Sequence, residues 1–190
     1  MKKTLLLLVL LTVFLQGCGA VVIGAATTGA SVIHDRRSAG TVLDDKNIQF
    51  KILSSISGDS ELRQHSSIAA TSYNYAVLLT GQAENANYRE RLTELARNTP
   101  MVKRVIDQIE IGESSSFSQE TQDAYLTAKV KVELLDISLP SFDPSRVKVV
   151  TEVSIVYLMG LVTEEEAAAV VEKVRYIKGV ERVVKIFEYI

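Results

Sequence analysis

The side chains that most often carry out chemistry are scarce in this sequence of 190 residues, which has one cysteine, Cys18, and two histidines, His34 and His65. A single cysteine excludes an internal disulfide and a cysteine-based zinc site, and two histidines leave little material for metal ligation. Both histidines lie in polar stretches without a carboxylate and a nucleophile at a matching spacing, so we expect ordinary surface histidines. The sequence contains no phosphate loop, dinucleotide fingerprint or zinc-protease motif.

Three consecutive glutamates at positions 164–166 are the remaining candidate for a metal or acid cluster. The amino terminus of a helix favours carboxylates through its dipole, so we interpret the three glutamates as the start of a helix. The sequence therefore shows no catalytic constellation. We expect a protein that is not an enzyme and that uses no cofactor and no metal ion.

The composition is that of a globular protein, with 47% hydrophobic and 23% charged residues, ten glycines and three prolines. The formal net charge is −2, from 21 basic and 23 acidic residues. Loss of Lys2 and Lys3 with an amino-terminal signal would change it to −4. A general nucleic-acid binder needs a basic surface, so we expect no nucleic-acid partner.

The amino terminus has the three parts of a secretory signal. Lys2 and Lys3 precede an apolar run of 11 residues at 5–15, and the run leads into Leu15-Gln16-Gly17-Cys18. Because the cysteine directly follows the small Gly17, the segment resembles a bacterial lipoprotein signal whose lipobox is residues 15–18. That resemblance implies cleavage before Cys18, a thioether-linked diacylglycerol on its sulfur, and acylation of the new amino terminus, for instance by palmitate. We expect a signal peptide at 1–17 and a lipidated tether at 18–45.

A membrane-spanning helix is the rival interpretation, because residues 4–33 carry no charge and a bilayer needs about 20 apolar residues. The apolar pattern is interrupted by Gly17, Gly19, Gly24, Thr27, Thr28 and Gly29. We therefore interpret residues 19–33 as a tether near the membrane. Gly19, rather than an aspartate, follows the cysteine, which in lipoproteins of this type points to the outer membrane. The expected location is the periplasmic face of the outer membrane.

The rest of the chain consists of two copies of one unit. Residues 68–81 align with residues 147–160 at a shift of 79. At a shift of 78, Ile48, Ile52 and Ile56 match Leu126, Val130 and Leu134, and residues 102–105 match residues 180–183. One residue has therefore been gained or lost within the repeat.

Each copy has the same expected order of elements, α-β-β-α-β. The matched apolar residues recur at i, i+4 and i+8, which predicts a first amphipathic helix. Hairpin strands are expected at 68–72 and 76–81 in one copy, and at 147–151 and 155–160 in the other. The last strands are expected at 102–111 and 180–190. This order predicts an α+β fold in which each copy is a two-layer sandwich with a three-stranded sheet.

The second helix of each copy has recognisable ends. In the later copy, Thr163 can cap the helix while Glu166 bonds back to its backbone, and Gly179 closes it. In the earlier copy, the helical face is Tyr88, Leu92 and Leu95, with a stop at Asn98 and Pro100. The serine-rich segment between the copies lacks periodicity, so we expect domains at 46–112 and 122–190 joined by a linker at 113–121. Domains this small are marginal alone, so contact between them is expected.

These features resemble the BON domain, since an apolar strand closed by glycine, a Glu-rich helix and a terminal Val-x-x-Val strand recur in that family. Two such units behind a lipobox are similar to the dual-BON outer-membrane lipoproteins. The most specific motif is Leu-Met-Gly-Leu-Val-Thr-Glu at 158–164 with Glu-Ala at 166–167, and the lead-in at 35–45 is also similar. One departure concerns the hairpins, where Tyr75 and Ser154 replace the family's glycine. A turn position with positive φ disfavours a side chain such as tyrosine.

The first helix of the second unit is apolar on two faces of a helical wheel of about 100° per residue. One face points to the core, and the opposite face carries Tyr125, Ala128, Val132 and Leu135, which we call the outer stripe. The matching positions of the first unit are Asn47, Phe50, Ser54 and Ser57. Three of these four are polar, so the fold itself does not require apolar residues there.

Two interpretations of the outer stripe remain open at this point, burial against the first domain or contact with lipid. The family resemblance favours lipid, because it implies that the first helix of the second BON domain binds anionic phospholipid. Tyr125 takes the place of the family's aromatic residue there. The expected phospholipid-binding residues are Tyr125, Ala128, Lys129, Val130, Val132 and Leu135. The mature charge opposes anionic lipid at a distance, so attraction is expected to be local to Lys129, Lys131, Arg146 and Lys148.

The expected function is that of a non-enzymatic lipoprotein that binds phosphatidylglycerol or cardiolipin and supports outer-membrane integrity. The resemblance also implies a role at division sites. The alternative is a periplasmic adaptor that docks on an envelope assembly machine, such as the outer-membrane protein assembly complex, through the same stripe or a sheet edge.

The lipobox interpretation is tested by Cys18→Ser, which removes the only thiol of the chain. We expect an unprocessed precursor of larger mass without palmitate label, because no other side chain can form the thioether. Gel mobility and metabolic labelling with palmitate measure both effects. Palmitate label on the variant would contradict the lipobox.

Overall fold

The computed structural model describes residues 35–190, and Arg36–Ile190 form one compact unit. The expected signal peptide, Cys18, most of the expected tether and His34 lie outside the described residues. Within the described part of the chain, no helix is long and apolar enough to cross a membrane.

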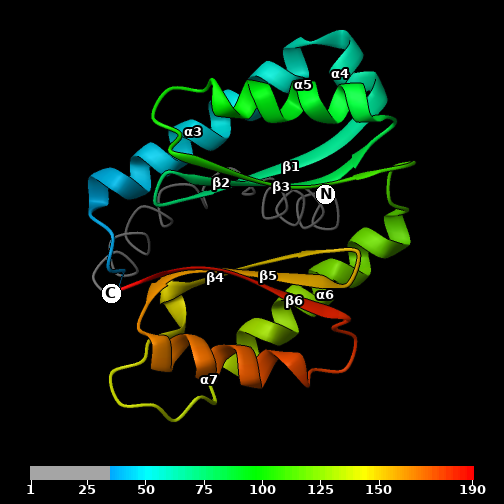
Figure 1. The fold of residues 1–190 in the computed structure, drawn as a ribbon. Helices are drawn as coiled ribbons and strands as arrows, with labels where there is room; N and C mark the ends of the chain where they lie inside the picture. The colour runs from blue at the N-terminus through cyan, green and yellow to red at the C-terminus, as the bar shows by residue number, and fades with distance from the viewer. Residues whose placement is uncertain (1–34) are drawn as a thin grey trace, which may run out of the picture. The chain divides into compact units, whose positions relative to one another are not determined.

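The first domain contains an α-β-β-α-β unit with one additional short helix. Its elements are α3 (Ala39–Gly58), α4 (Ser60–His65), β1 (Ser66–Tyr73), β2 (Ala76–Ala83), α5 (Ala86–Arg97) and β3 (Arg104–Ile111). Strand β2 is central, antiparallel to β1 and parallel to β3. The helices cover one face of this sheet (Figure 1). The short helix α4 was not predicted, and it is capped by the Asp59 carboxylate, which accepts from the N–H groups of Glu61 and Leu62.

The second domain repeats the same topology. Its elements are α6 (Phe117–Leu134), the 3-10 helix η2 (Pro144–Arg146), β4 (Val147–Glu152), β5 (Ile155–Val162), α7 (Glu164–Arg175) and β6 (Arg182–Tyr189). Strand β5 is central, antiparallel to β4 and parallel to β6. Helices α6 and α7 lie on one face of the sheet (Figure 1). The predicted α+β fold with two three-stranded, two-layer units is confirmed.

Two helices begin inside segments that we expected to be irregular. Helix α3 begins at Ala39 with Ser38 as its cap, so residues 39–45, which we assigned to the tether, are helical. Helix α6 begins at Phe117 with Ser116 as its cap, inside the expected linker at 113–121. In both cases a serine hydroxyl accepts from a first-turn N–H, which is enough to start the helix ahead of its apolar repeat.

Each domain has a core between its helices and its sheet. The predicted inward residues of the first helices are all buried there: Ile48, Ile52, Ile56, Leu126, Val130 and Leu134. A third buried cluster joins the two domains through the sheet faces that carry no helices, and it comprises Tyr73, Leu78, Tyr157, Met159 and Ile186. The expected contact between the domains is therefore a sheet-to-sheet contact. All eight residues of the central strand β2 are buried, because one face meets helices and the other meets the second sheet.

Both hairpin turns adopt positive φ without glycine. The angles are 49° at Asn74 and 67° at Tyr75, and 45° at Val153 and 62° at Ser154. The replacement of the family's glycine has therefore not removed the tight turn. Such backbone costs on the order of 1 kcal/mol or more per residue and persists only where surrounding contacts hold it.

A buried carboxylate from the first helix of each domain holds the turn. Asp45 accepts from the N–H groups of Asn74 at 2.7 Å and Tyr75 at 2.9 Å. Asp123 accepts in the same way from Val153 at 2.8 Å and Ser154 at 2.9 Å. The two aspartates are 3% and 7% exposed. They are also 78 residues apart, so the repeat includes this carboxylate-to-turn contact.

The carboxylate-to-turn contact predicts a large effect of Asp123→Asn. The amide keeps the size of the side chain but places an NH2 group against a backbone N–H, which leaves a buried donor unsatisfied. We expect the free energy of unfolding to fall by about 2–3 kcal/mol, measured by urea denaturation. Asp136→Asn is the matched control, since Asp136 lies in the exposed segment after α6, and it should change stability by less than about 0.5 kcal/mol. Equal stability of the two variants would contradict the turn-holding role.

Candidate functional site

The outer stripe lies on the solvent-facing side of α6 and at its end. Tyr125 is 69% exposed, Val132 62% and Leu135 69%, and Ala128 is exposed as well. Positions 125, 128, 132 and 135 are separated by three, four and three residues, the spacing that aligns side chains along one face of a helix. The interpretation that these residues bury against the first domain is wrong, because their large side chains are more than half exposed.

One expected phospholipid-binding residue is misplaced. Val130 is 0% exposed and packs in the core of the second domain with Leu126 and Leu134. Its position four residues from each of these places it on the inward face of α6, so it cannot meet lipid while the domain is folded. Lys129 is half-buried, and its ammonium group donates to the Lys178 carbonyl at 3.2 Å. The outward part of the expected set is thus the outer stripe.

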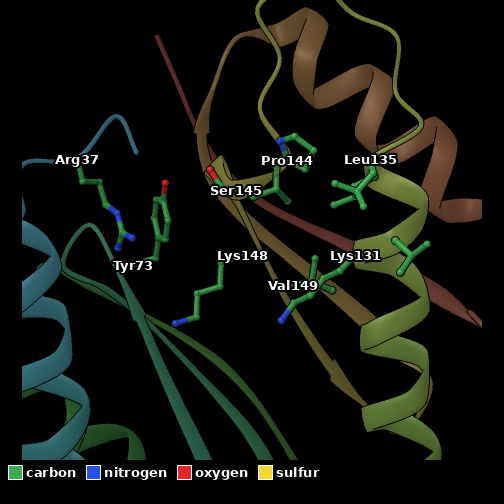
Figure 2. A pocket seen from close by; sticks show the side chains of 11 residues that line it. Arg37, Tyr73, Lys131, Leu135, Pro144, Ser145, Lys148 and Val149 are labelled. Atoms are coloured by element: carbon green, nitrogen blue, oxygen red, sulfur yellow. The ribbon is translucent and has the colours of Figure 1, made fainter. Parts of the chain in front are cut away.

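A hollow of about 530 Å³ opens beside the carboxyl-terminal half of α6 (Figure 2). Helix α6 contributes Lys131, Val132, Leu134 and Leu135, and the segment leading into β4 contributes Pro144, Ser145, Val147, Lys148 and Val149. The first domain adds Arg37 and Tyr73. Sequence reasoning found the two lysines but missed Arg37 and Tyr73, because only the tertiary fold brings the first domain to this place.

Lys148 is a partly buried cation of this hollow, and its pKa is lowered. Burial, together with the positive charges of Lys46, Arg37 and Lys131, lowers the pKa of Lys148 to about 8, against a smaller opposing effect of the Asp45 carboxylate. Lys131 is exposed on α6. No hydrogen bond or ion pair to the described residues engages either ammonium group.

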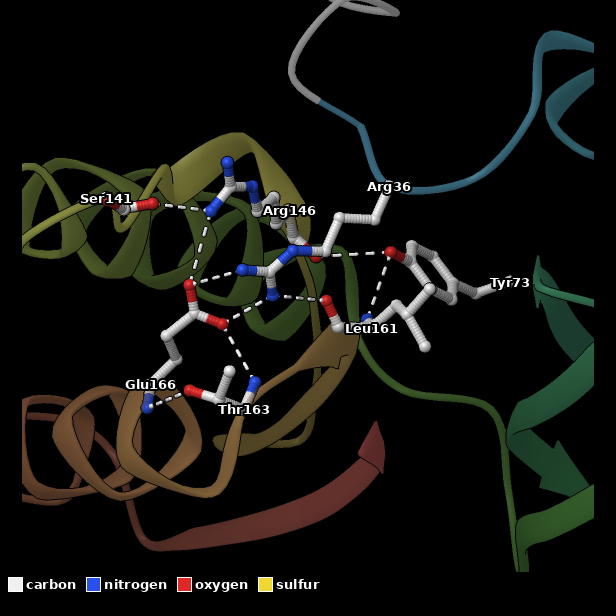
Figure 3. A network of polar contacts seen from close by, with 7 residues as sticks. All are labelled: Arg36, Tyr73, Ser141, Arg146, Leu161, Thr163 and Glu166. Atoms are coloured by element: carbon white, nitrogen blue, oxygen red, sulfur yellow. Dashed lines mark hydrogen bonds and ion pairs between the residues drawn. The ribbon is translucent and has the colours of Figure 1, made fainter. Parts of the chain in front are cut away.

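Arg146, which we expected to attract lipid phosphate, has another role. Its guanidinium donates to the Ser141 carbonyl at 2.6 Å and to Glu166 Oε1 at 3.2 Å (Figure 3). Arg36 holds the same carboxylate through two bonds of 2.5 and 2.9 Å and also donates to the Leu161 carbonyl at 3.0 Å. The charge of Arg146 is therefore largely compensated within the protein.

Glu166 belongs to a structural network. It forms the predicted capping box with Thr163, which confirms the interpretation of the three glutamates as a helix start. Burial alone would raise the pKa of Glu166, but hydrogen bonds from Arg36 and from the Thr163 N–H hold that pKa below its usual value. Among the described residues, no group of three His, Cys, Asp or Glu side chains is placed to hold a metal ion. His65 stacks on Tyr88 and contacts the Glu84 carboxylate.

Comparison with known proteins defines the class. The BON domain model matches residues 44–113 and 122–190. The chain is 35% identical over 189 residues to outer membrane lipoprotein DolP of Haemophilus influenzae, covering 99% of this chain and 96% of that protein. It is 33% identical over 156 residues to a 21 kDa hemolysin of Actinobacillus pleuropneumoniae, covering 82% and 79% of the two chains.

A solved structure of the CdsD carboxyl-terminal domain, from the type III secretion system of Chlamydia trachomatis, also matches. It covers 74% of this chain and 96% of that one, with a TM-score of 0.31 and 12% identity. This likeness is too low to bear on the fold, so the assignment depends on the family match and on the relatives. The chain belongs to the BON-domain family, as a dual-BON protein of the DolP type.

The environment of Lys148 predicts a pH-dependent effect on stability. The pKa of Lys148 is lower in the folded than in the unfolded state, so the charged lysine lowers the free energy of unfolding. This cost is complete below about pH 8 and disappears as the pH rises from about 8 to above 10. We expect Lys148→Met to raise the free energy of unfolding at pH 7 by about 1–2 kcal/mol. The gain is smaller than it would be for a fully buried lysine, because solvent reaches the hollow and screens the charge. Urea denaturation at pH 7 and pH 10 measures the difference.

The control is Lys185→Met, which removes an exposed lysine from β6, at the other edge of the same sheet. Its effect should be small and equal at the two pH values. A loss of stability in Lys148→Met at pH 7 would show that the lysine supports the fold, and the interpretation of an uncompensated charge would be wrong.

Proposed function

We propose that this protein is a non-enzymatic lipoprotein of the outer membrane, held at its periplasmic face by acyl chains on Cys18. It binds anionic phospholipid, phosphatidylglycerol or cardiolipin, through the outer stripe of α6, and it supports outer-membrane integrity, including at division sites. The observation that carries the proposal is the apolar outer stripe, which stays exposed although both domain cores and the contact between the domains are complete. Similarity to a relative named as an outer membrane lipoprotein supports the location.

The repeat strengthens the argument that the outer stripe has a function. At the positions where α6 carries Tyr125, Val132 and Leu135, α3 carries the exposed Asn47, Ser54 and Ser57. The fourth matching position reverses the pattern, with an exposed Phe50 opposite Ala128. The fold therefore accepts polar residues at the three positions where α6 holds large apolar ones. Exposed apolar side chains grouped on one helix face mark a surface for lipid or for a partner.

The energy of the outer stripe suits reversible docking. Burying its three large side chains contributes on the order of 4–8 kcal/mol before the costs of ordering. Such a contact is weak alone, but the acyl chains keep the domain near the membrane, where it rebinds at high effective concentration. Arg146 is compensated and Lys129 is half-buried, whereas Lys131 and Lys148 line the same hollow as Val132 and Leu135. Selectivity for anionic lipid is then a short-range effect, since the net charge of the chain is negative.

The proposal predicts that Tyr125→Asp and Leu135→Glu each abolish binding to vesicles that contain phosphatidylglycerol or cardiolipin. A carboxylate on the outer stripe meets water in the free protein, but it must be desolvated against lipid. The melting temperature should hardly change. Flotation with a chain that begins at Gly19, which keeps all of Arg36–Ile190, measures binding without the acyl anchor.

Val130→Asp is the control for folding, since it buries an unpaired carboxylate and should lower the melting temperature strongly. If Tyr125→Asp unfolds the domain as Val130→Asp does, the outer stripe belongs to the core. If the unmodified chain does not float with anionic vesicles at all, the same stripe favours a protein partner, such as an outer-membrane assembly complex.

A further inference from the structure

The hollow beside the outer stripe combines apolar walls with two lysines, Lys131 and Lys148, that form no hydrogen bond or ion pair with the described residues. Figure 2 shows Lys131 reaching in from α6 and Lys148 from β4. Val132 and Leu135 line the hollow and also belong to the outer stripe, so the hollow and the stripe are continuous. On the other side Tyr73 and Pro144 add apolar surface.

The charges around Lys148 make this place suitable for an anion. Lys46, Arg37 and Lys131 repel its ammonium group, and within the described residues no acceptor is hydrogen-bonded to it. Arg37 itself is held by the Asp45 carboxylate at 2.8 Å, with its guanidinium 3.8 Å from the centre of the Tyr73 ring. Arg37 therefore contributes positive potential from a fixed position rather than a free hydrogen-bonding group. An anion beside Lys148 would offset the repulsion that its ammonium group feels from Lys46, Arg37 and Lys131.

We propose that the hollow is a headgroup site, in which Lys131 and Lys148 hold the phosphate of a single anionic phospholipid while its acyl chains leave along Val132 and Leu135. This rests on the proposed docking of the outer stripe and goes beyond it, because it assigns one lipid molecule to each protein and makes the first domain part of the site. The occupant is a lipid rather than free phosphate, since Val132, Leu135, Tyr73 and Pro144 offer apolar contact that an inorganic ion cannot use. The low pKa of Lys148 supports the assignment, since a bound phosphate would raise that pKa again.

The test measures the rate at which each lysine of the lipidated protein is acetylated in nanodiscs. Only the neutral amine reacts, so at neutral pH Lys148 should react faster than an exposed lysine of ordinary pKa. Nanodiscs of phosphatidylcholine alone are compared with nanodiscs that also contain phosphatidylglycerol, and mass spectrometry gives the rate at each lysine. We expect phosphatidylglycerol to slow Lys148 by more than about tenfold, because each unit of pKa changes the neutral fraction tenfold. Lys185, at the far edge of the same sheet, should keep its rate.

The outcomes separate the lipid site from its alternatives. Equal rates at Lys148 with and without phosphatidylglycerol overturn the headgroup site. If the same flotation series still shows binding that depends on Tyr125, the docking proposal stands without it. Inorganic phosphate added to phosphatidylcholine nanodiscs is the third arm. Slowing of Lys148 by inorganic phosphate as strong as that by phosphatidylglycerol would define a free-anion site and overturn the lipid assignment.

Variants give a second measure by flotation. Lys148→Gln should lower the preference for phosphatidylglycerol over phosphatidylcholine vesicles by at least about fivefold, equal to about 1 kcal/mol. Lys148→Arg should keep most of the preference because it retains the charge, and Lys185→Gln should keep all of it. An unchanged preference in Lys148→Gln, in a protein that melts normally, would overturn the site.

Discussion

The packing of two sheets face to face determines what the rest of this molecule can present to its surroundings. Each BON domain has one sheet face covered by its own helices and one face that only the other domain covers. Polar contacts close the edges of this apolar contact, with the Gln82 amide donating to Glu152 at 2.9 Å and the Asn74 amide to Glu188 at 2.5 Å. Because the sheets satisfy each other, the outward faces of the first helices are not needed for folding. Those faces are where the two copies diverge.

The same organisation explains an unusual feature of the turns. A tyrosine and a serine occupy positions where glycine would be the unstrained choice, and a buried aspartate from the neighbouring helix accepts from the strained backbone. In the first domain Asp45 also accepts from the Ser72 hydroxyl at 2.7 Å and pairs with Arg37. The carboxylate therefore links the helix, the hairpin and the lead-in segment. Residues that looked like the end of a tether are part of the first domain for this reason.

Some cations of the second domain are engaged in ion pairs within the protein, whereas others are not. Glu166 forms ion pairs with both Arg36 and Arg146 at the start of α7, so these two cations are engaged within the protein. Lys131 and Lys148 are left without a protein partner among the described residues. A protein whose net charge is negative can thus still offer a small positive site, and its position next to the outer stripe matches the layered chemistry of a lipid, phosphate beside hydrocarbon.

The amino-acid sequence alone determined the repeat, the order of elements in each copy and the inward residues of the first helices. The physical reason is that these features are local, since helical periodicity, apolar strands and caps such as Thr163 depend on residues near in sequence. Tertiary structure decided how the domains meet, because sheet-to-sheet packing brings Tyr73, Tyr157 and Met159 into one buried cluster although they are far apart in sequence. It also decided that Val130 is buried, that Arg146 is compensated by Glu166, and that Arg37 faces Lys148. Each of these depends on long-range packing, which fixes burial and charge neighbours that no local pattern of residues contains.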